Sequence, residues 1–345
     1  MDEASCPLGD AVRGWAARPA RCADALRALE GIDDLAASLA RDRLLGEFVA
    51  VTRSVWTTTG HRPRSGVVAA SAAVLLGVVG CTPSQAVSTP AASGAETLPF
   101  SHVHGVGFDP GDGALLVATH DGLFVVDEAG DANRVGPVID LMGFVVAGPE
   151  RLLASGHPGP DVDLPEPVGL IESTDGGRSW DPVSRQGESD FHALATGDAG
   201  ILGYDGELRR STDGVAWEPA DIPAPPAALA ASPTGPEVLA TTSQGLLRSA
   251  DGGATWSEVD GAPLLQVVAW GEDGATVAGV EPSGTVWVSA DGAATWQRGP
   301  ETGAPVQAVA VGSADDGAVR IAVVTTEAVL LSEDDGQTFE ALTGL

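Results

Sequence analysis

The sequence contains no lysine, and all 18 of its basic residues are arginines, against 48 aspartates and glutamates. The imbalance lies in one part of the chain. Residues 1–81 carry nine Arg and nine acidic residues, whereas residues 82–345 carry nine Arg and 39 acidic residues. A net charge of −30 repels phosphate backbones and anionic lipid headgroups. The composition therefore argues against a nucleic-acid partner. It is compatible with cations or basic partners, or simply with a well-solvated, soluble surface.

Cysteine and tyrosine are scarce as well. The three cysteines, Cys6, Cys22 and Cys81, all lie before residue 100, so the rest of the sequence can form neither a disulfide nor a thiolate metal site. Cys6 and Cys22 lack the C-x-x-C spacing of zinc sites. The only tyrosine, Tyr204, leaves one candidate for any reaction that needs a tyrosine nucleophile.

Turn-forming residues, by contrast, are abundant, and one turn pattern recurs. The chain has 45 Gly and 24 Pro, and S-x-D-x-G-x-x-W or a near copy starts five times, at spacings of 38, 38, 40 and 43 residues. Such a period, with strand-like residues between the turns, is typical of propeller blades with four strands each. The copies are STDGGRSW at Ser173–Trp180, STDGVAW at Ser211–Trp217, SADGGATW at Ser249–Trp256, SADGAATW at Ser289–Trp296 and SEDDGQTF at Ser332–Phe339.

Six short stretches fit the first strand of a blade, and they lie at 102–108, 142–148, 190–196, 227–232, 265–270 and 306–311. They predict an all-β fold over residues 100–345: a single β-propeller of six four-stranded blades, with seven blades as the alternative. Residues 96–100 are expected to close the ring by pairing with the last blade.

Each recurring turn is expected to have a structural role. The Ser and Asp side chains can bond to nearby backbone, Gly supplies unusual backbone angles, and the aromatic residue offers an apolar face to bury. The residues concerned are Ser173, Asp175, Gly177, Trp180, Ser211, Asp213, Trp217, Ser249, Asp251, Gly253, Trp256, Ser289, Asp291, Trp296, Ser332, Asp334, Gly336 and Phe339.

The turn pattern resembles the Asp box of the BNR-repeat propellers, which include sialidases, sortilin-type receptors and photosystem assembly factors. A narrower similarity is carried by HVHG, MGF…SGHP, GLIESTDGG and DFHAL in this order. These segments resemble a group of bacterial lipoproteins that are labelled glycosyl hydrolases. The resemblances imply a propeller and, as functions, glycoside hydrolysis or assembly of a membrane complex.

The residues before the repeats are typical of an export signal. The uncharged, mainly apolar run Val67–Gly80 is too short to span a bilayer comfortably but matches the core of a secretory signal. The following Cys81 ends a sequence that looks like a bacterial lipobox, so residues 61–81 predict a lipoprotein signal with lipidation of Cys81. Residues 82–99 are interpreted as a flexible tether, and residues 1–60 as a helical extension or a wrongly assigned start. A short transmembrane helix carrying a cytoplasmic domain is the alternative.

All five histidines of the repeat region are expected on one face of the ring. They lie where first strands begin or second strands end, and these positions share one edge of a blade, opposite the recurring turns. Imidazoles beside carboxylates are ligands for zinc, copper and other divalent metals. We therefore expect a metal or polar-ligand site near the channel mouth, whereas histidines that only bond to neighbouring loops are the alternative. The candidates are His102, His104, His120, His157, His192 and Asp190, with Asp161, Asp163 and Glu166 on a nearby insertion at 158–169.

Catalytic candidates are weaker. A sialidase would use Tyr204 as nucleophile and three Arg around the substrate carboxylate, but several of the nine Arg lie at or beside the recurring turns. Glu281 and Glu327 could serve another glycosidase as paired carboxylates. The sequence favours a monomeric binding module, exported and lipid-anchored on the outer face of the cytoplasmic membrane, for a metal, a glycan or a membrane protein. A non-sialidase glycoside hydrolase and an assembly factor are the alternatives.

Overall fold

The computed structural model of the chain describes residues 98–100, 102–127, 130–314 and 317–342. The predictions for the extension, the signal segment, the lipidated Cys81 and nearly all of the tether lie outside these residues. Within the described part of the chain every regular element is a β-strand. A search of the same residues finds no helix that is long and apolar enough to cross a membrane.

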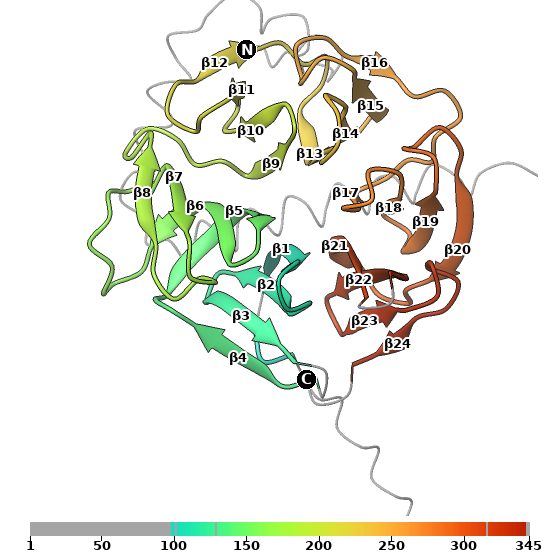
Figure 1. Cartoon of the computed structure of the whole chain (residues 1–345), viewed down its shortest axis with the longest axis horizontal. Helices are drawn as coiled ribbons and strands as arrows, with labels where there is room; N and C mark the ends of the chain where they lie inside the picture. The colour runs from blue at the N-terminus through green and yellow to red at the C-terminus, as the bar shows by residue number, and fades with distance from the viewer. Residues whose placement is uncertain (1–97, 101, 128–129, 315–316, 343–345) are drawn as a thin grey trace, which may run out of the picture. The chain divides into compact units, whose positions relative to one another are not determined.

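The strands form six antiparallel sheets, and each sheet consists of four strands that follow one another in the chain. Figure 1 shows these sheets as blades around a central axis, with the first and last blades side by side where the ring closes. The predicted all-β propeller of six four-stranded blades is confirmed, and the described residues form no seventh blade.

The blades have these bounds. Blade one contains β1 (Val103–Phe108), β2 (Leu115–Thr119), β3 (Gly122–Val126) and β4 (Ala132–Val135). Blade two contains β5 (Ile139–Gly148), β6 (Arg151–Pro158), β7 (Leu170–Ser173) and β8 (Asp181–Ser184). Blade three contains β9 (Ala193–Gly197), β10 (Gly200–Tyr204), β11 (Leu208–Ser211) and β12 (Glu218–Ala220). Blade four contains β13 (Pro226–Ala231), β14 (Val238–Thr242), β15 (Gly245–Ser249) and β16 (Ser257–Glu258). Blade five contains β17 (Val267–Trp270), β18 (Val277–Val280), β19 (Thr285–Ser289) and β20 (Gln297–Glu301). Blade six contains β21 (Val306–Ser313), β22 (Val319–Thr325), β23 (Val329–Ser332) and β24 (Glu340–Ala341).

A cluster of buried apolar side chains fills each interface between neighbouring blades. Successive side chains of a strand point to opposite neighbours, so Leu152 of β6 packs toward blade one and Leu153 toward blade three. Both are almost fully buried, and burial of one leucine side chain stabilises a fold by about 1.5–3 kcal/mol. The hydrophobic core is therefore divided among the interfaces, and every blade depends on both of its neighbours.

The ring closes through side-chain packing. Phe100 is buried between blades six and one, with its ring centroid 5.3 Å from that of Phe124. Leu98, and Leu342 just after β24, pack against the same cluster. The described residues before β1 form no strand, so the strand pairing expected near Phe100 is replaced there by apolar contacts.

The recurring turns connect the third and fourth strands of a blade, and hydrogen bonds within each turn hold its shape. In the first copy, Ser173 Oγ donates to Asp175 Oδ1 at 2.8 Å and accepts the Gly177 N–H at 2.8 Å. The Asp175 carboxylate also accepts the N–H and the hydroxyl of Ser179, at 2.9 and 2.7 Å. The Ser–Asp bond recurs in the other four copies. Gly177 has a φ of 86°, and a Cβ there would lie 2.2 Å from a Leu123 methyl of blade one.

The recurring turns all lie on one face of the ring. The Gly176 N–H donates to the Glu150 carbonyl, and the Gly252 N–H donates to the Pro236 carbonyl, both at 2.9 Å. Each bond joins a recurring turn to the turn between the first and second strands of its own blade. First strands therefore begin, and second strands end, at the opposite face. We call that opposite face the histidine face, because the histidines of blades one to three lie on it.

Candidate functional site

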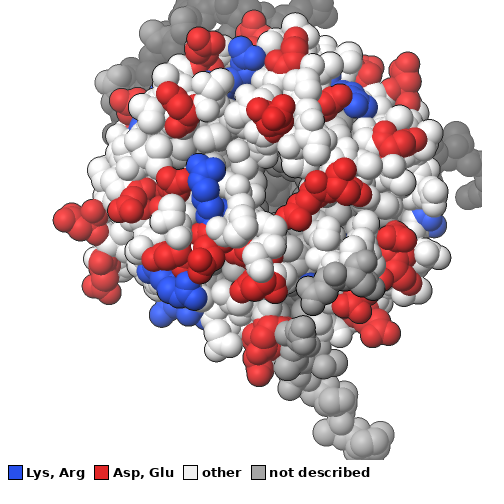
Figure 2. All heavy atoms as spheres, in the orientation of Figure 1, with Lys and Arg blue, Asp and Glu red and all other residues white. Residues whose placement is uncertain are grey.

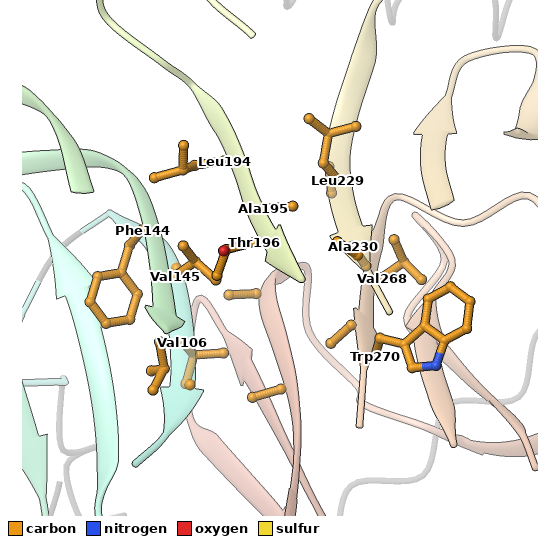
Figure 3. A pocket seen from close by; sticks show the side chains of 18 of the residues that line it. Val106, Phe144, Val145, Leu194, Ala195, Thr196, Leu229, Ala230, Val268 and Trp270 are labelled. Carbon is orange, nitrogen blue, oxygen red and sulfur yellow. The ribbon is translucent and has the colours of Figure 1, made fainter. Parts of the chain in front are cut away.

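The first strands of the six blades surround a central cavity of about 560 Å³. Figure 3 shows part of its wall, in which small and apolar side chains such as Ala195, Ala230 and Val268 come from different blades. His104 and His192 also line the cavity. The histidine face therefore borders a space in which a ligand could reach both imidazoles.

Three polar side chains of blades one and two converge at the edge of this cavity. His104 Nε2 lies 3.4 Å from His120 Nδ1, and His120 Nδ1 lies 2.7 Å from Asp140 Oδ2. His104 Nε2 lies 3.7 Å from Asp140 Oδ1. One donor atom from each residue fits within a group whose members are all within 4.8 Å of one another. We call His104, His120 and Asp140 the triad.

Local backbone features place each member of the triad. His104 occupies a β-bulge, since the pairing of β1 with β2 shifts between Val103 and Gly105, and bulges redirect a side chain. His120 lies in the turn after β2, which is held by the buried Thr119 hydroxyl donating to the Gly122 carbonyl at 2.9 Å.

Asp140 lies in β5 and depends on a close approach of β6. A Cβ at Gly156 would lie 1.9 Å from the Asp140 carbonyl oxygen, and the φ of Gly156 is 145°. Glycine is therefore required at position 156. The pairing of β5 with β6 also places Asp140 directly opposite His157.

The electrostatics of the triad favour a neutral imidazole beside a carboxylate. Burial of the His104 ring, followed by its closeness to His120, lowers the pKa of His104 to about 4. The Oδ1 atom of Asp140 is buried and has no hydrogen-bond partner among the described residues. Buried polar atoms are usually satisfied, and one that is not often marks a place where water or an ion binds. A neutral imidazole is also the form that coordinates metals.

A second group lies where blades two and three meet. Asp190 Oδ2 lies 2.8 Å from His192 Nε2 and 3.2 Å from His157 Nε2. The opposite nitrogen of His157, Nδ1, contacts the carboxylate of Glu166 on the insertion. We call Asp190, His157 and His192 the Asp190 group.

The Asp190 group is held by a buried phenylalanine. Phe191 is fully buried, and its N–H donates to the buried Ser155 hydroxyl of blade two at 2.9 Å. Its ring packs against Trp217, with centroids 4.9 Å apart. Because Phe191 is anchored in the interface, the residues on either side of it, Asp190 and His192, are fixed at the histidine face.

The pKa shifts of His157 and His192 have the opposite direction to that of His104. The hydrogen bond to Asp190 raises the pKa of His192 above its usual value. Burial opposes a similar rise at His157, but the Glu166 hydrogen bond and the Asp190 charge outweigh it and raise that pKa as well. Burial would raise the pKa of Asp190, yet its bonds to the two imidazoles lower it. This group is a charge-assisted network, whereas His104 remains neutral.

The structure thus divides the predicted histidine site into two groups and adds one residue. His102 precedes β1 with a φ of 48° and contacts the triad only through its ring, 5.2 Å from that of His120. Asp140 was not among the candidates, because the first strand of blade two was expected to start at Met142. Residues 139–141, Ile-Asp-Leu, alternate between apolar and polar side chains, as expected for a half-buried strand. Their burial alternates in the same way in the structure.

The structure places the catalytic candidates Glu281, Glu327 and Tyr204 in three different blades. Both carboxylate oxygens of Glu281 are bound within blade five, by the Trp287 indole N–H at 3.0 Å and the Ser283 hydroxyl at 2.9 Å. Glu327 is exposed in the turn after β22. Tyr204 packs against the core between blades three and four. The adjacent Asp205 is bound by the Ser189 hydroxyl and by Arg209.

The surface of the propeller is acidic. Figure 2 shows one face of the ring, on which acidic side chains greatly outnumber basic ones around a central hollow. Arginines are mostly paired with acidic neighbours, such as Arg151 with Glu172 at 2.6 Å. The resulting potential attracts cations to the molecule and repels anions.

No family model matches the sequence, and no curated protein matches it. Solved propeller structures do align with it. An ancestral GH74 enzyme aligns with a TM-score of 0.46 and 13% identity, over 70% of this chain and 38% of its own. YCF48 bound to a D1 peptide aligns with a TM-score of 0.45 and 18% identity, over 72% of this chain and 84% of its own. A streptogramin B lyase aligns with a TM-score of 0.46 and 16% identity, over 70% and 83%. The chain spans well under half of the GH74 enzyme, and these likenesses concern the fold alone.

Proposed function

We propose that the protein is an extracytoplasmic binding module whose histidine face holds a divalent cation, zinc or copper, at the triad. The observation that carries this proposal is the convergence of His104 Nε2, His120 Nδ1 and Asp140 on one point. Nitrogen ligands bind zinc at about 2.0–2.1 Å, so the ligands of a tetrahedral site lie about 3.3–3.4 Å apart. The 3.4 Å between His104 Nε2 and His120 Nδ1 matches this spacing, and the 2.7 and 3.7 Å to the two oxygens of Asp140 differ from it by up to about 0.7 Å.

Three protein ligands leave one position of a tetrahedral cation open. The His120 side chain is 41% exposed, and His104 lines the central cavity, so an outside ligand can reach that position. A cation here would recruit a polar or anionic group that the acidic surface alone repels. The triad is therefore a binding site for a cation and, through it, for a second molecule.

Titration of the full chain with Zn²⁺, followed by calorimetry, tests the triad. Asp140→Asn and Glu327→Gln each remove one negative charge from the same face, but only Asp140 belongs to the triad. We expect Asp140→Asn and His120→Ala to weaken one binding event by more than the roughly 10–100-fold that loss of a hydrogen-bond partner of a metal ligand costs. Glu327→Gln should bind as the wild type does. Equal affinities in all four proteins would overturn the proposal.

We also propose that the module is anchored through a lipid on Cys81. What supports this is the apolar run Val67–Gly80 immediately before Cys81 and the small residue Gly80 at the cleavage position. Fractionation of cells expressing the wild type and Cys81→Ser tests it. The wild type should sediment with membranes, and the variant should lose the lipid mass and the membrane association. A variant that stays in the membrane would contradict lipid anchoring and favour a transmembrane helix.

A further inference from the structure

The backbone of the first strands forms much of the wall of the central cavity. Every blade contributes an unbroken run of residues to this wall. The runs are 104–108, 144–148, 192–198, 227–231, 267–270 and 307–311. Successive side chains of a strand point to opposite sides, so a wall made of side chains would contain only every second residue of a strand. The unbroken runs therefore indicate that the strands turn an edge toward the axis.

The packing of β9 explains why its edge faces the cavity. Leu194 packs into the cluster between blades two and three, and Ala195 packs into the cluster between blades three and four. Figure 3 shows these two side chains on opposite sides of the strand. Because neighbouring blades take up the side chains on both sides, the edge of the backbone is what remains for the cavity.

Each first strand is also an edge strand of its sheet. The order of strands places it at one end of the sheet, with the second strand as its one strand partner. In Figure 1 the first strands of the six blades surround the axis. Along an edge strand, every second residue directs its N–H and C=O groups away from the partner strand. The cavity thus presents rows of backbone donors and acceptors, to which an extended peptide can bind by adding a strand.

The size of the cavity suits a short peptide. β13 has six residues, and at about 3.3 Å per residue such a strand is about 20 Å long. An extended peptide of about five residues therefore matches the length of the first strands. The cavity volume of about 560 Å³ favours small side chains on this peptide.

The two ends of the cavity differ in charge. His104 lines the end at the histidine face, where a cation at the triad would keep one position open. Glu272 and Asp198 line the other end, in the turns after β17 and β9. Burial, followed by the charge of Asp109, raises the pKa of Glu272, so the potential at this end is negative. A carboxylate fits the first end, and an ammonium group fits the second.

We propose that the cavity binds a free oligopeptide of about five residues in an extended conformation, with its C-terminal carboxylate on the cation and its amides bonded to the first strands. The N-terminal ammonium group lies at the acidic end, near Glu272. This inference rests on the proposed cation at the triad, and it names the second molecule that the cation recruits.

Calorimetry on the full chain, loaded with Zn²⁺ and freed of excess metal, tests this proposal with penta-alanine as the probe. We expect one peptide to bind per chain. The C-terminal amide of penta-alanine and a form N-methylated at its internal amides should each bind about tenfold more weakly or less, because each lacks bonds that the peptide makes in the cavity. Acetate supplies a carboxylate without a strand, so an affinity for acetate equal to that for penta-alanine would overturn the proposal.

A zinc titration of the same protein distinguishes failure of this proposal from failure of the proposed function. If zinc binds at the triad and penta-alanine does not bind, the peptide site is wrong and the cation site stands. If zinc does not bind, the cation site is wrong, and the peptide site as proposed is wrong with it.

Hydrogen exchange locates the bound peptide. Amides of the first strands, such as those of Ala193–Gly197 in β9, should exchange more slowly when penta-alanine is bound, because the peptide covers the edges that face the cavity. Protection confined to the outer strands of the blades would contradict binding in the cavity.

Glu272 provides a test of the orientation of the peptide. Glu272→Gln should weaken the binding of penta-alanine and leave that of N-acetyl-penta-alanine, which has no ammonium group, unchanged. Glu258→Gln is the matched control, because Glu258 is exposed in β16 and does not line the cavity. It removes the same charge and should leave both affinities unchanged. Equal effects of the two substitutions on penta-alanine would overturn the proposed orientation.

Discussion

His120 Nδ1 and Asp140 Oδ2 lie 2.7 Å apart, although His120 belongs to blade one and Asp140 to blade two. The pair therefore exists only when the interface between these blades is formed. The same holds for His157 and Asp190, which come from blade two and from the segment leading into blade three. A ligand of the histidine face is thus expected to stabilise the assembled ring.

This linkage gives a first prediction, on thermal stability. Zn²⁺ at about 100 times its dissociation constant should raise the free energy of unfolding by about 2.7 kcal/mol for one site, because the ion binds the folded chain preferentially. Differential scanning calorimetry with Zn²⁺ and with chelator measures the difference. His120→Ala/Asp140→Asn should melt at the same temperature in both conditions, and a zinc-dependent shift in that variant would place the cation elsewhere.

The recurring turns give a second prediction. Ser249 Oγ accepts the Gly253 N–H at 2.8 Å and donates to Asp251 Oδ1 at 2.8 Å, and Ser249 is 1% exposed. Ser249→Ala leaves that buried N–H without its partner and should lower the free energy of unfolding by about 1–3 kcal/mol. Ser257→Ala, in the exposed strand that follows, is the matched control and should change it by less than about 0.5 kcal/mol. Urea denaturation measures the free energy of unfolding of both variants. Equal midpoints would contradict a stabilising role of the Ser249 hydrogen bonds.

A third prediction concerns acid stability. Hydrogen bonds from the Thr255 and Thr295 hydroxyls, followed by backbone N–H groups, lower the pKa of Asp251 and Asp291 from 3.8 to about 2. Carboxylates whose pKa is lower in the folded state contribute stability that is present above their unfolded pKa and is lost as pH falls through the folded value. The free energy of unfolding should therefore decrease as pH falls from 3.8 toward about 2. In Asp251→Asn that pH dependence should be shallower, and an unchanged slope would count against the prediction.

The fourth prediction concerns the backbone beneath the triad. Gly156→Ala would place a Cβ 1.9 Å from the Asp140 carbonyl oxygen, so the β5–β6 pairing must move. Gly187→Ala is a matched control, because Gly187 also has a positive φ of 73° but has nothing within 4 Å of a Cβ. The control should lose about 1–2 kcal/mol from the left-handed conformation alone. Gly156→Ala should lose more and should also weaken zinc binding, whereas equal losses would contradict the close-approach argument.

Strand order was sufficient to predict the blades and the shared face of the histidines. The period of the Ser173 and Ser249 turns gives the blade length, and the up-and-down order of strands gives the edge on which His104 and His120 lie. Neither depends on side-chain detail, so both can be read from a single sequence.

The grouping of the side chains could not be predicted in the same way. The bulge that directs His104 depends on the register between β1 and β2, and this register cannot be predicted from the sequence pattern. Asp140 was missed because β5 begins three residues before the expected start. Glu281 lies at the predicted edge of its blade, but Trp287 and Ser283 bind its carboxylate. The order of strands alone does not predict such side-chain partners.

Anomalous scattering from crystals soaked with Zn²⁺ shows whether the triad binds a cation. Data collected on either side of the zinc absorption edge locate the ion without reference to the protein atoms. We expect an anomalous peak within bonding distance of His104 Nε2, His120 Nδ1 and the Asp140 carboxylate, and we expect no such peak in Asp140→Asn. Zinc-saturated crystals with no peak at the triad would contradict the proposed cation site.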